Sequence, residues 1–99
     1  MNKLELVKAI AADSKLTQKD VYKMLNSMEK VMIETLENGD EVKLVGFMTA
    51  KPVGRAARKG RNPHDGTPVR IPEKVDVFIK PGENLKRAVS GLKYEDYAE

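Results

Sequence analysis

The sequence predicts an α+β fold with two amphipathic helices, a set of short β-strands that includes a projecting ribbon, and a third helix. Apolar residues recur at steps of three and four through residues 1–40, which is typical of helices. From Glu41 onward they alternate with polar residues, which is typical of strands. Asn38-Gly39 separates the two patterns and is a strong helix stop. A chain of 99 residues is expected to form one domain.

The first helix is expected to begin after Asn2, whose side chain can cap it, and to end near Asp13 or Ser14. The second helix is expected to begin after Thr17 and to continue to Asn38-Gly39. Its apolar stripe is wider than one short helix can cover, and it comprises Val21, Met24, Leu25, Met28, Val31, Met32 and Leu36. A stripe of this kind favours a core or a dimer interface over the alternative, a ligand groove.

Residues 53–74 are expected to form a two-stranded ribbon. Extended patterns at Val53 to Arg58 and at Val69 to Ile71 flank a turn signal at Asn62-Pro63 and Asp65-Gly66. Pro52, Pro68 and Pro72 each lack a backbone N–H, so this region is expected to be edge-like rather than central in a sheet. Residues 41–52 and 75–80 supply the other strands, and residues 81–99 a third helix with an extension.

Positive charge is concentrated in one part of the chain. The formal net charge is only +3, but residues 51–70 carry six Lys or Arg against one Asp. Local density matters more than the total, because exposed charges interact strongly only within a Debye length of about 8–10 Å. The segment is therefore predicted to bind a polyanion. A solvated linker is the alternative, and the matched extended patterns on both sides favour a ribbon.

The composition argues against several classes of function. The chain has no cysteine and a single histidine, His64, within the basic segment, so we expect no enzyme, no metal site and no cofactor. The glycines do not have the spacing of a phosphate-binding loop, and no small-molecule substrate is expected. No apolar run approaches the roughly 20 residues of a membrane span, and the charged N-terminal segment does not resemble a signal peptide. A soluble intracellular protein without a membrane partner is the expectation.

Double-stranded DNA is the favoured partner. The basic segment has no aromatic residue on which unpaired bases could stack, since the aromatic residues are Tyr22, Phe47, Phe78, Tyr94 and Tyr97. No predicted helix is rich in base-reading Arg, Asn and Gln, so low sequence specificity is expected. Two alternatives stay open, namely RNA bound by the same arm and an acidic protein or other polyanion.

Four motifs carry a family likeness. Gly46-Phe47, Ala57 to Pro63, Ile71-Pro72 and Lys80-Pro81-Gly82, in this order and spacing, resemble the HU/IHF family of bacterial DNA-bending proteins. The likeness covers about residues 1–90. Residues 91–99 form an extension that resembles the one on histone-like relatives encoded by Bacillus phages, so a phage or prophage origin is among the expectations.

The resemblance implies an intertwined homodimer with a helical base, a β-saddle and two protruding β-ribbon arms. Such a dimer binds the minor groove of double-stranded DNA and bends it without a cofactor. Pro63 matches the arm-tip proline that intercalates between base pairs. The other DNA-binding candidates are Arg55, Arg58, Lys59, Arg61, Asn62 and Arg70 on the arm, and Lys3, Lys80 and Lys86 on the body. A cytoplasmic, nucleoid-associated location follows from this resemblance.

The chain departs from the family pattern at three places. Ala50 and Ile79 stand where the family often has aromatic residues, which affects core packing. Glu83 stands where many relatives have Lys, which removes one contact to phosphate and introduces repulsion. The acidic tail is expected to extend the third helix and to pack on the dimer.

Overall fold

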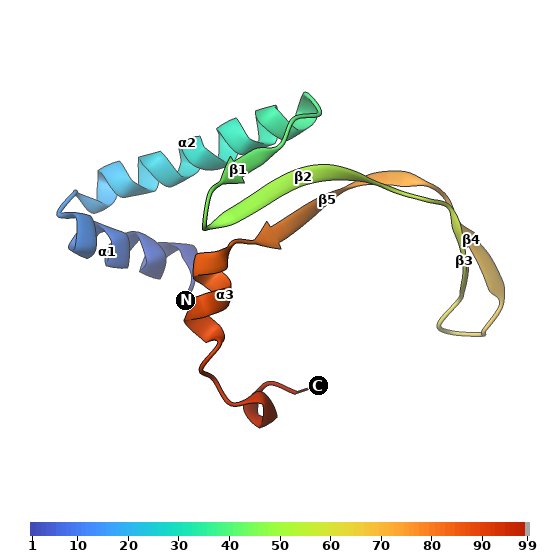
Figure 1. Cartoon of the computed structure of the whole chain (residues 1–99). Coiled ribbons are helices and arrows are strands. Elements are labelled where there is room, and N and C mark those ends of the chain that lie inside the picture. The colour runs from blue at the N-terminus through green and yellow to red at the C-terminus, as the bar shows by residue number, and fades with distance from the viewer. Residues whose placement is uncertain (99) are drawn as a thin grey trace.

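The computed structural model describes residues 1–98 and contains helices, a small sheet and a long arm (Figure 1). The elements are α1 (Lys3–Ser14), α2 (Gln18–Glu37), β1 (Val42–Leu44), β2 (Met48–Arg55), β3 (Arg58–Arg61), β4 (Pro68–Ile71), β5 (Lys74–Pro81), α3 (Glu83–Val89) and the 3-10 helix η1 (Tyr94–Asp96). The predicted α+β class is confirmed. Within residues 1–98, no helix is both long enough and apolar enough to cross a membrane.

Both long helices begin at the predicted caps. The Asn2 side chain accepts a hydrogen bond of 2.9 Å from the backbone N–H of Glu5, which satisfies one of the free donors of the first turn. Thr17 accepts the equivalent bond of 3.1 Å from the backbone N–H of Asp20. Between the helices, Lys15 adopts a left-handed conformation with φ of 62° and turns the chain.

The core of the single chain is small. Val7, Ala11 and Val21 bury their side chains where α1 packs on α2, with Ile10 and Leu25 partly buried around them. The remaining buried apolar side chain among the described residues is Ala50, on β2. The radius of gyration is 18.8 Å, whereas a compact domain of about 100 residues has about 13 Å. The chain is therefore extended and leaves much apolar surface in contact with solvent.

The strands form two antiparallel sheets. The first has the order β1-β2-β5, and the second consists of β3 and β4 at the far end of the arm (Figure 1). β2 is thus the central strand of this sheet, which differs from the expectation that the region around Pro52 is edge-like. That expectation holds at Pro52 itself, for the following reason. β1 pairs with Met48–Ala50, so at Pro52 the only neighbouring strand is β5, through Val77. The missing N–H of this proline therefore breaks no ladder on the β1 side.

Two of the sequence motifs meet in space. The turn between β1 and β2 contains Gly46, whose φ of 82° favours glycine, and this turn lies against the junction of β5 and α3. Gly82 donates a backbone hydrogen bond of 2.6 Å to the carbonyl of Phe47, and Asn84 donates one of 2.9 Å to the carbonyl of Gly46. A Cβ on Gly82 would lie 2.4 Å from the carbonyl carbon of Gly46. The close approach therefore requires glycine at residue 82.

The third helix is shorter than expected. α3 ends at Val89, and the chain continues through a turn to η1 rather than as a longer helix, so the predicted helical extension is wrong. Ser90 is the C-cap, and its hydroxyl donates a hydrogen bond of 2.8 Å to the carbonyl of Arg87, which satisfies one of the acceptors at the helix end. Gly91 then disfavours continuation, and no residue of α3 is buried in the single chain to stabilise a longer helix. Glu99 lies outside the described residues.

Candidate nucleic-acid interface

The register of the sheet gathers cations on one of its faces. Residues that pair across antiparallel strands project to the same face, and this face alternates along each strand. One row comprises Lys43, Thr49 and Lys80, and the following rows are Lys51 with Phe78, Val53 with Asp76, and Arg55 with Lys74. We call the five basic residues of this set, which are Lys43, Lys51, Arg55, Lys74 and Lys80, the cationic sheet face. All five are exposed.

The opposite face of the sheet is directed toward the helices. Ala50 and its partner Ile79 belong to this face. Ala50 is 1% exposed, and α2 packs against β2. The cationic sheet face is therefore on the side of the sheet away from α2. In Figure 1 the arm bends toward this same side, on which α3 also lies.

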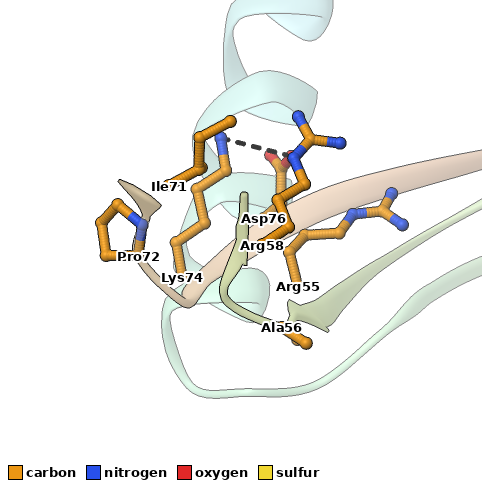
Figure 2. A pocket seen from close by; sticks show the side chains of 8 residues that line it. Arg55, Ala56, Arg58, Ile71, Pro72, Lys74 and Asp76 are labelled. Carbon is orange, nitrogen blue, oxygen red and sulfur yellow. Dashed lines mark ion pairs between the residues drawn. The ribbon is translucent and has the colours of Figure 1, made fainter. Parts of the chain in front are cut away.

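One carboxylate, Asp76, lies among the cations where the sheet continues into the arm. It forms an ion pair of 3.9 Å with Lys74, and both side chains are about half exposed. Arg55 and Arg58 line the same hollow (Figure 2). A pair this exposed contributes about 0–1 kcal/mol, since solvent screens it. Lys74 therefore remains able to bind a phosphate.

The arm divides its own cations between two faces. Lys59 pairs with Arg70, and Arg61 pairs with Pro68, so three cations share one face. Arg58 pairs with Ile71 on the other face, which also contains Gly60. A Cβ on Gly60 would lie 2.9 Å from the Cδ1 atom of Ile71. The Ile71 side chain therefore packs directly over Gly60 on this face. The arm is thus basic on one face and more apolar on the other.

The tip of the arm is a closed loop of residues 62–67. The backbone N–H of Asn62 donates to the carbonyl of Thr67, and that of Gly66 donates to the carbonyl of Asn62, both at 2.8 Å. The Asn62 side chain accepts a bond of 2.9 Å from the N–H of His64. Pro63 directly follows Asn62, lies in the turn and is exposed to solvent. The predicted turn is therefore present, with the proline at its start.

The Asp65 carboxylate closes the returning side of the tip. It accepts hydrogen bonds from the hydroxyl and from the backbone N–H of Thr67, the latter at 3.0 Å. Since these donors favour the charged form, they lower the pKa of Asp65 below its ordinary value. These hydrogen bonds therefore stabilise the ionised form of the Asp65 carboxylate.

The remaining candidates lie on the helices. Lys3 donates a hydrogen bond to the Asn26 side chain, and its ammonium lies 4.9 Å from the centre of the Tyr22 ring, so it is attached to α2. Lys86 on α3 lies 3.9 Å from the carboxylate of Glu83, and both side chains are at least half exposed. The predicted candidates are thus divided among the arm, the cationic sheet face and the helices.

Sequence reasoning missed three members of the cationic sheet face, which are Lys43, Lys51 and Lys74. Lys51 and Arg55 are separated by an even number of residues, as are Lys74 and Lys80, and this spacing places each pair on one face of its strand. That signal was available in the sequence. The pairing that places the strands side by side was not, because it depends on the register between β2 and β5.

The fold and this interface define a small nucleic-acid-binding protein whose cations lie on a sheet and a β-ribbon arm. The family model described as Bacterial DNA-binding protein matches residues 1–90. The chain therefore belongs to this family, which includes the HU proteins, as its motifs predicted. The family and the curated relatives are DNA-binding proteins rather than enzymes, which confirms the expectation of a non-enzymatic protein.

Curated relatives match over most or all of the chain. Transcription factor 1 of Bacillus phage SP01 is 56% identical over 99 residues and is covered completely, as is this chain. DNA-binding protein HU 1 of Bacillus subtilis is 46% identical over 91 residues, which are 92% of this chain and 99% of the relative. The phage protein thus also matches the extension, which confirms the likeness to a phage relative.

Solved structures support the same fold. The Anabaena HU–DNA cocrystal structure matches with a TM-score of 0.83 at 34% identity, covering 92% of this chain and 99% of the other. The solution structure of a mutant of Transcription factor 1 matches with a TM-score of 0.64 at 56% identity and covers both chains completely.

Proposed function

We propose that this chain forms a homodimer that binds the minor groove of double-stranded DNA and bends it by inserting Pro63 between base pairs. Minor-groove architectural proteins, of which HU is an example, insert apolar side chains in this way and kink the duplex. The observation that carries the proposal is the position of Pro63, which is exposed in the turn at the end of an arm whose strands carry the cations.

The need for a second copy follows from the exposed apolar surface. Met28, Val31 and Ile33 on α2 are each about half exposed in the single chain. An open apolar groove lies between α1 and α2 and is lined by residues that include Leu6, Leu25, Met32 and Leu36. A chain with so few buried side chains gains little stability from its own core, since stability scales with buried apolar area. A second copy that covers this surface supplies the missing core.

The cations account for affinity. The cationic sheet face continues into the arm, so two copies would present a basic surface flanked by two basic arms. Neutralising phosphates releases counterions, and each neutralised phosphate contributes about 0.9 to the slope of log affinity against log salt. Insertion of a proline costs a few kcal/mol per unstacked base step, which the contacts made by bent DNA offset.

Specificity would come mainly from the ease with which DNA deforms. Lysines and arginines on strands favour the phosphate backbone, which is the same in every sequence. Flexible steps, mismatches and modified bases that soften the duplex would therefore be preferred. A protein of this kind would associate with the nucleoid of a bacterial host, whether the gene is bacterial or phage-encoded.

The test uses a short duplex with a fluorescent dye at each end, in which bending raises energy transfer. The parent protein is expected to raise energy transfer between the dyes. Pro63→Ala is expected to bind the duplex but to raise energy transfer much less. Pro68→Ala is the matched control, because this proline lies in the same arm but in strand β4. Equal bending by Pro63→Ala and the parent would refute the wedge. Equal affinity for duplex RNA and duplex DNA at the same salt concentration would favour the RNA alternative.

A further inference from the structure

We propose that Asp65 and Thr67 are positioning residues that hold Pro63 in the orientation needed for insertion. This inference rests on the proposed wedge function of Pro63. It assigns to a carboxylate at the arm tip a role in DNA bending, although a carboxylate repels DNA. Asp65 and Thr67 together are called the tip clamp below.

The geometry fixes the loop on both sides of the proline. Before Pro63, Asn62 forms backbone bonds to Thr67 and Gly66, and its side chain binds the N–H of His64. After Pro63, the tip clamp ties Asp65 to both the N–H and the hydroxyl of Thr67. Thr67 thus takes part in both sets of bonds. Removal of the clamp frees residues 65–67. These residues include Gly66 and Thr67, which form the two backbone bonds to Asn62.

The charge of Asp65 makes a purely electrostatic role unfavourable. The residue is the only acidic one in the basic segment 51–70. A carboxylate at the end of an arm that enters a groove lined by phosphates weakens binding, because like charges repel. Its removal should therefore tighten binding if charge is its only contribution. If the tip clamp orients Pro63, its removal should instead weaken binding and reduce bending.

Preorganisation explains how the clamp would act on DNA binding. A free loop must lose backbone freedom when the proline inserts, and each ordered residue costs about 1–2 kcal/mol of conformational entropy. A loop already closed by hydrogen bonds has lost that freedom before binding. The lowered pKa of Asp65 agrees with this geometry, because the clamp stabilises the ionised carboxylate. The clamp therefore stabilises the closed loop at pH values above the ordinary pKa of Asp65. This stabilisation is lost as the pH falls through the lowered pKa of Asp65.

The experiment compares four variants with the parent and with Pro63→Ala in the same energy-transfer assay. Asp65→Ala removes both bonds of the clamp, Thr67→Val removes the hydroxyl bond and keeps the backbone bond, and Thr67→Ser keeps both. Glu73→Ala is the charge control, because it removes one carboxylate from the base of the arm and leaves the tip unchanged. We expect Asp65→Ala to bend DNA as little as Pro63→Ala and to bind about tenfold more weakly, which corresponds to about 1.4 kcal/mol. Thr67→Val should change bending and affinity in the same direction but by less, because the backbone bond remains, and Thr67→Ser should bend DNA as the parent does.

The outcomes separate the clamp from the wedge. If Asp65→Ala tightens binding and leaves bending unchanged, as Glu73→Ala should, the clamp is refuted while the wedge survives. If Pro63→Ala bends DNA as well as the parent, the wedge and the clamp both fail. A second measurement follows the carboxyl carbon of Asp65 by NMR in the free protein. Its pKa should rise in Thr67→Val and stay low in Thr67→Ser, and an equal pKa in the two variants would also refute the clamp.

Discussion

Substitution of Gly82 by alanine should strongly destabilise the fold. The new Cβ would lie 2.4 Å from the carbonyl carbon of Gly46 and 2.6 Å from the backbone nitrogen of Phe47. Backbone atoms cannot rotate away, so the turn and the strand end must separate. This motion breaks the bonds that Gly82 and Asn84 donate to the turn. Two lost hydrogen bonds at about 0.5–1.5 kcal/mol each, with about 1–3 kcal/mol of overpacking, give a cost of about 2–6 kcal/mol.

Thermal unfolding followed by circular dichroism measures this cost. A loss of 1 kcal/mol lowers the midpoint by about 4–8 °C in a domain of this size, so a fall of at least about 8 °C is expected. Protein concentration must be held constant, because the stability of a dimer depends on it. Gly91→Ala is the matched control, since a Cβ there meets no atom within 4 Å. A midpoint for Gly82→Ala within a few degrees of this control would refute the packing argument.

Two further predictions concern DNA affinity and assembly. Lys51→Ala should reduce the slope of log affinity against log salt by about 1.8 per dimer, because each copy loses one phosphate contact worth about 0.9, whereas Lys30→Ala on α2 should leave the slope unchanged. Met28→Asp should abolish the dimer in sedimentation experiments, because the half-exposed side chain would be buried between copies and a buried carboxylate costs several kcal/mol. Lys19→Asp in the first turn of α2 should remain dimeric, and a dimeric Met28→Asp would contradict the proposed interface.

The sequence was sufficient for the features that depend on local chemistry. Asn2 and Thr17 cap their helices because their side chains reach a backbone N–H three residues away, and such contacts need no tertiary structure. The turn at Asn62-Pro63 was predictable for the same reason, since proline and Asn favour it in any context. The family motifs added the expectation of a projecting arm.

The features that the sequence did not reveal depend on contacts between distant segments. β2 is central at Ala50 yet lacks a β1 neighbour at Pro52, and this difference follows from the shortness of β1. The end of α3 was mispredicted because the sequence pattern does not show packing, and no residue of α3 (Glu83–Val89) is buried in the single chain. Helix stability in proteins comes mostly from such packing, which a pattern alone does not specify.

The three-stranded sheet makes more contacts with the rest of the molecule than the arm does. Gly82 and the turn at Gly46-Phe47 join β5 to the β1–β2 connection through backbone contacts, so the cationic sheet face has little freedom to change shape. Beyond Arg55, only the pairing of β3 with β4 holds the arm, and an isolated two-stranded ribbon is marginal in water. An arm of this kind can follow the curvature of DNA, but a wedge requires a fixed orientation at its end. The hydrogen bonds within the tip supply that local rigidity where the ribbon itself does not.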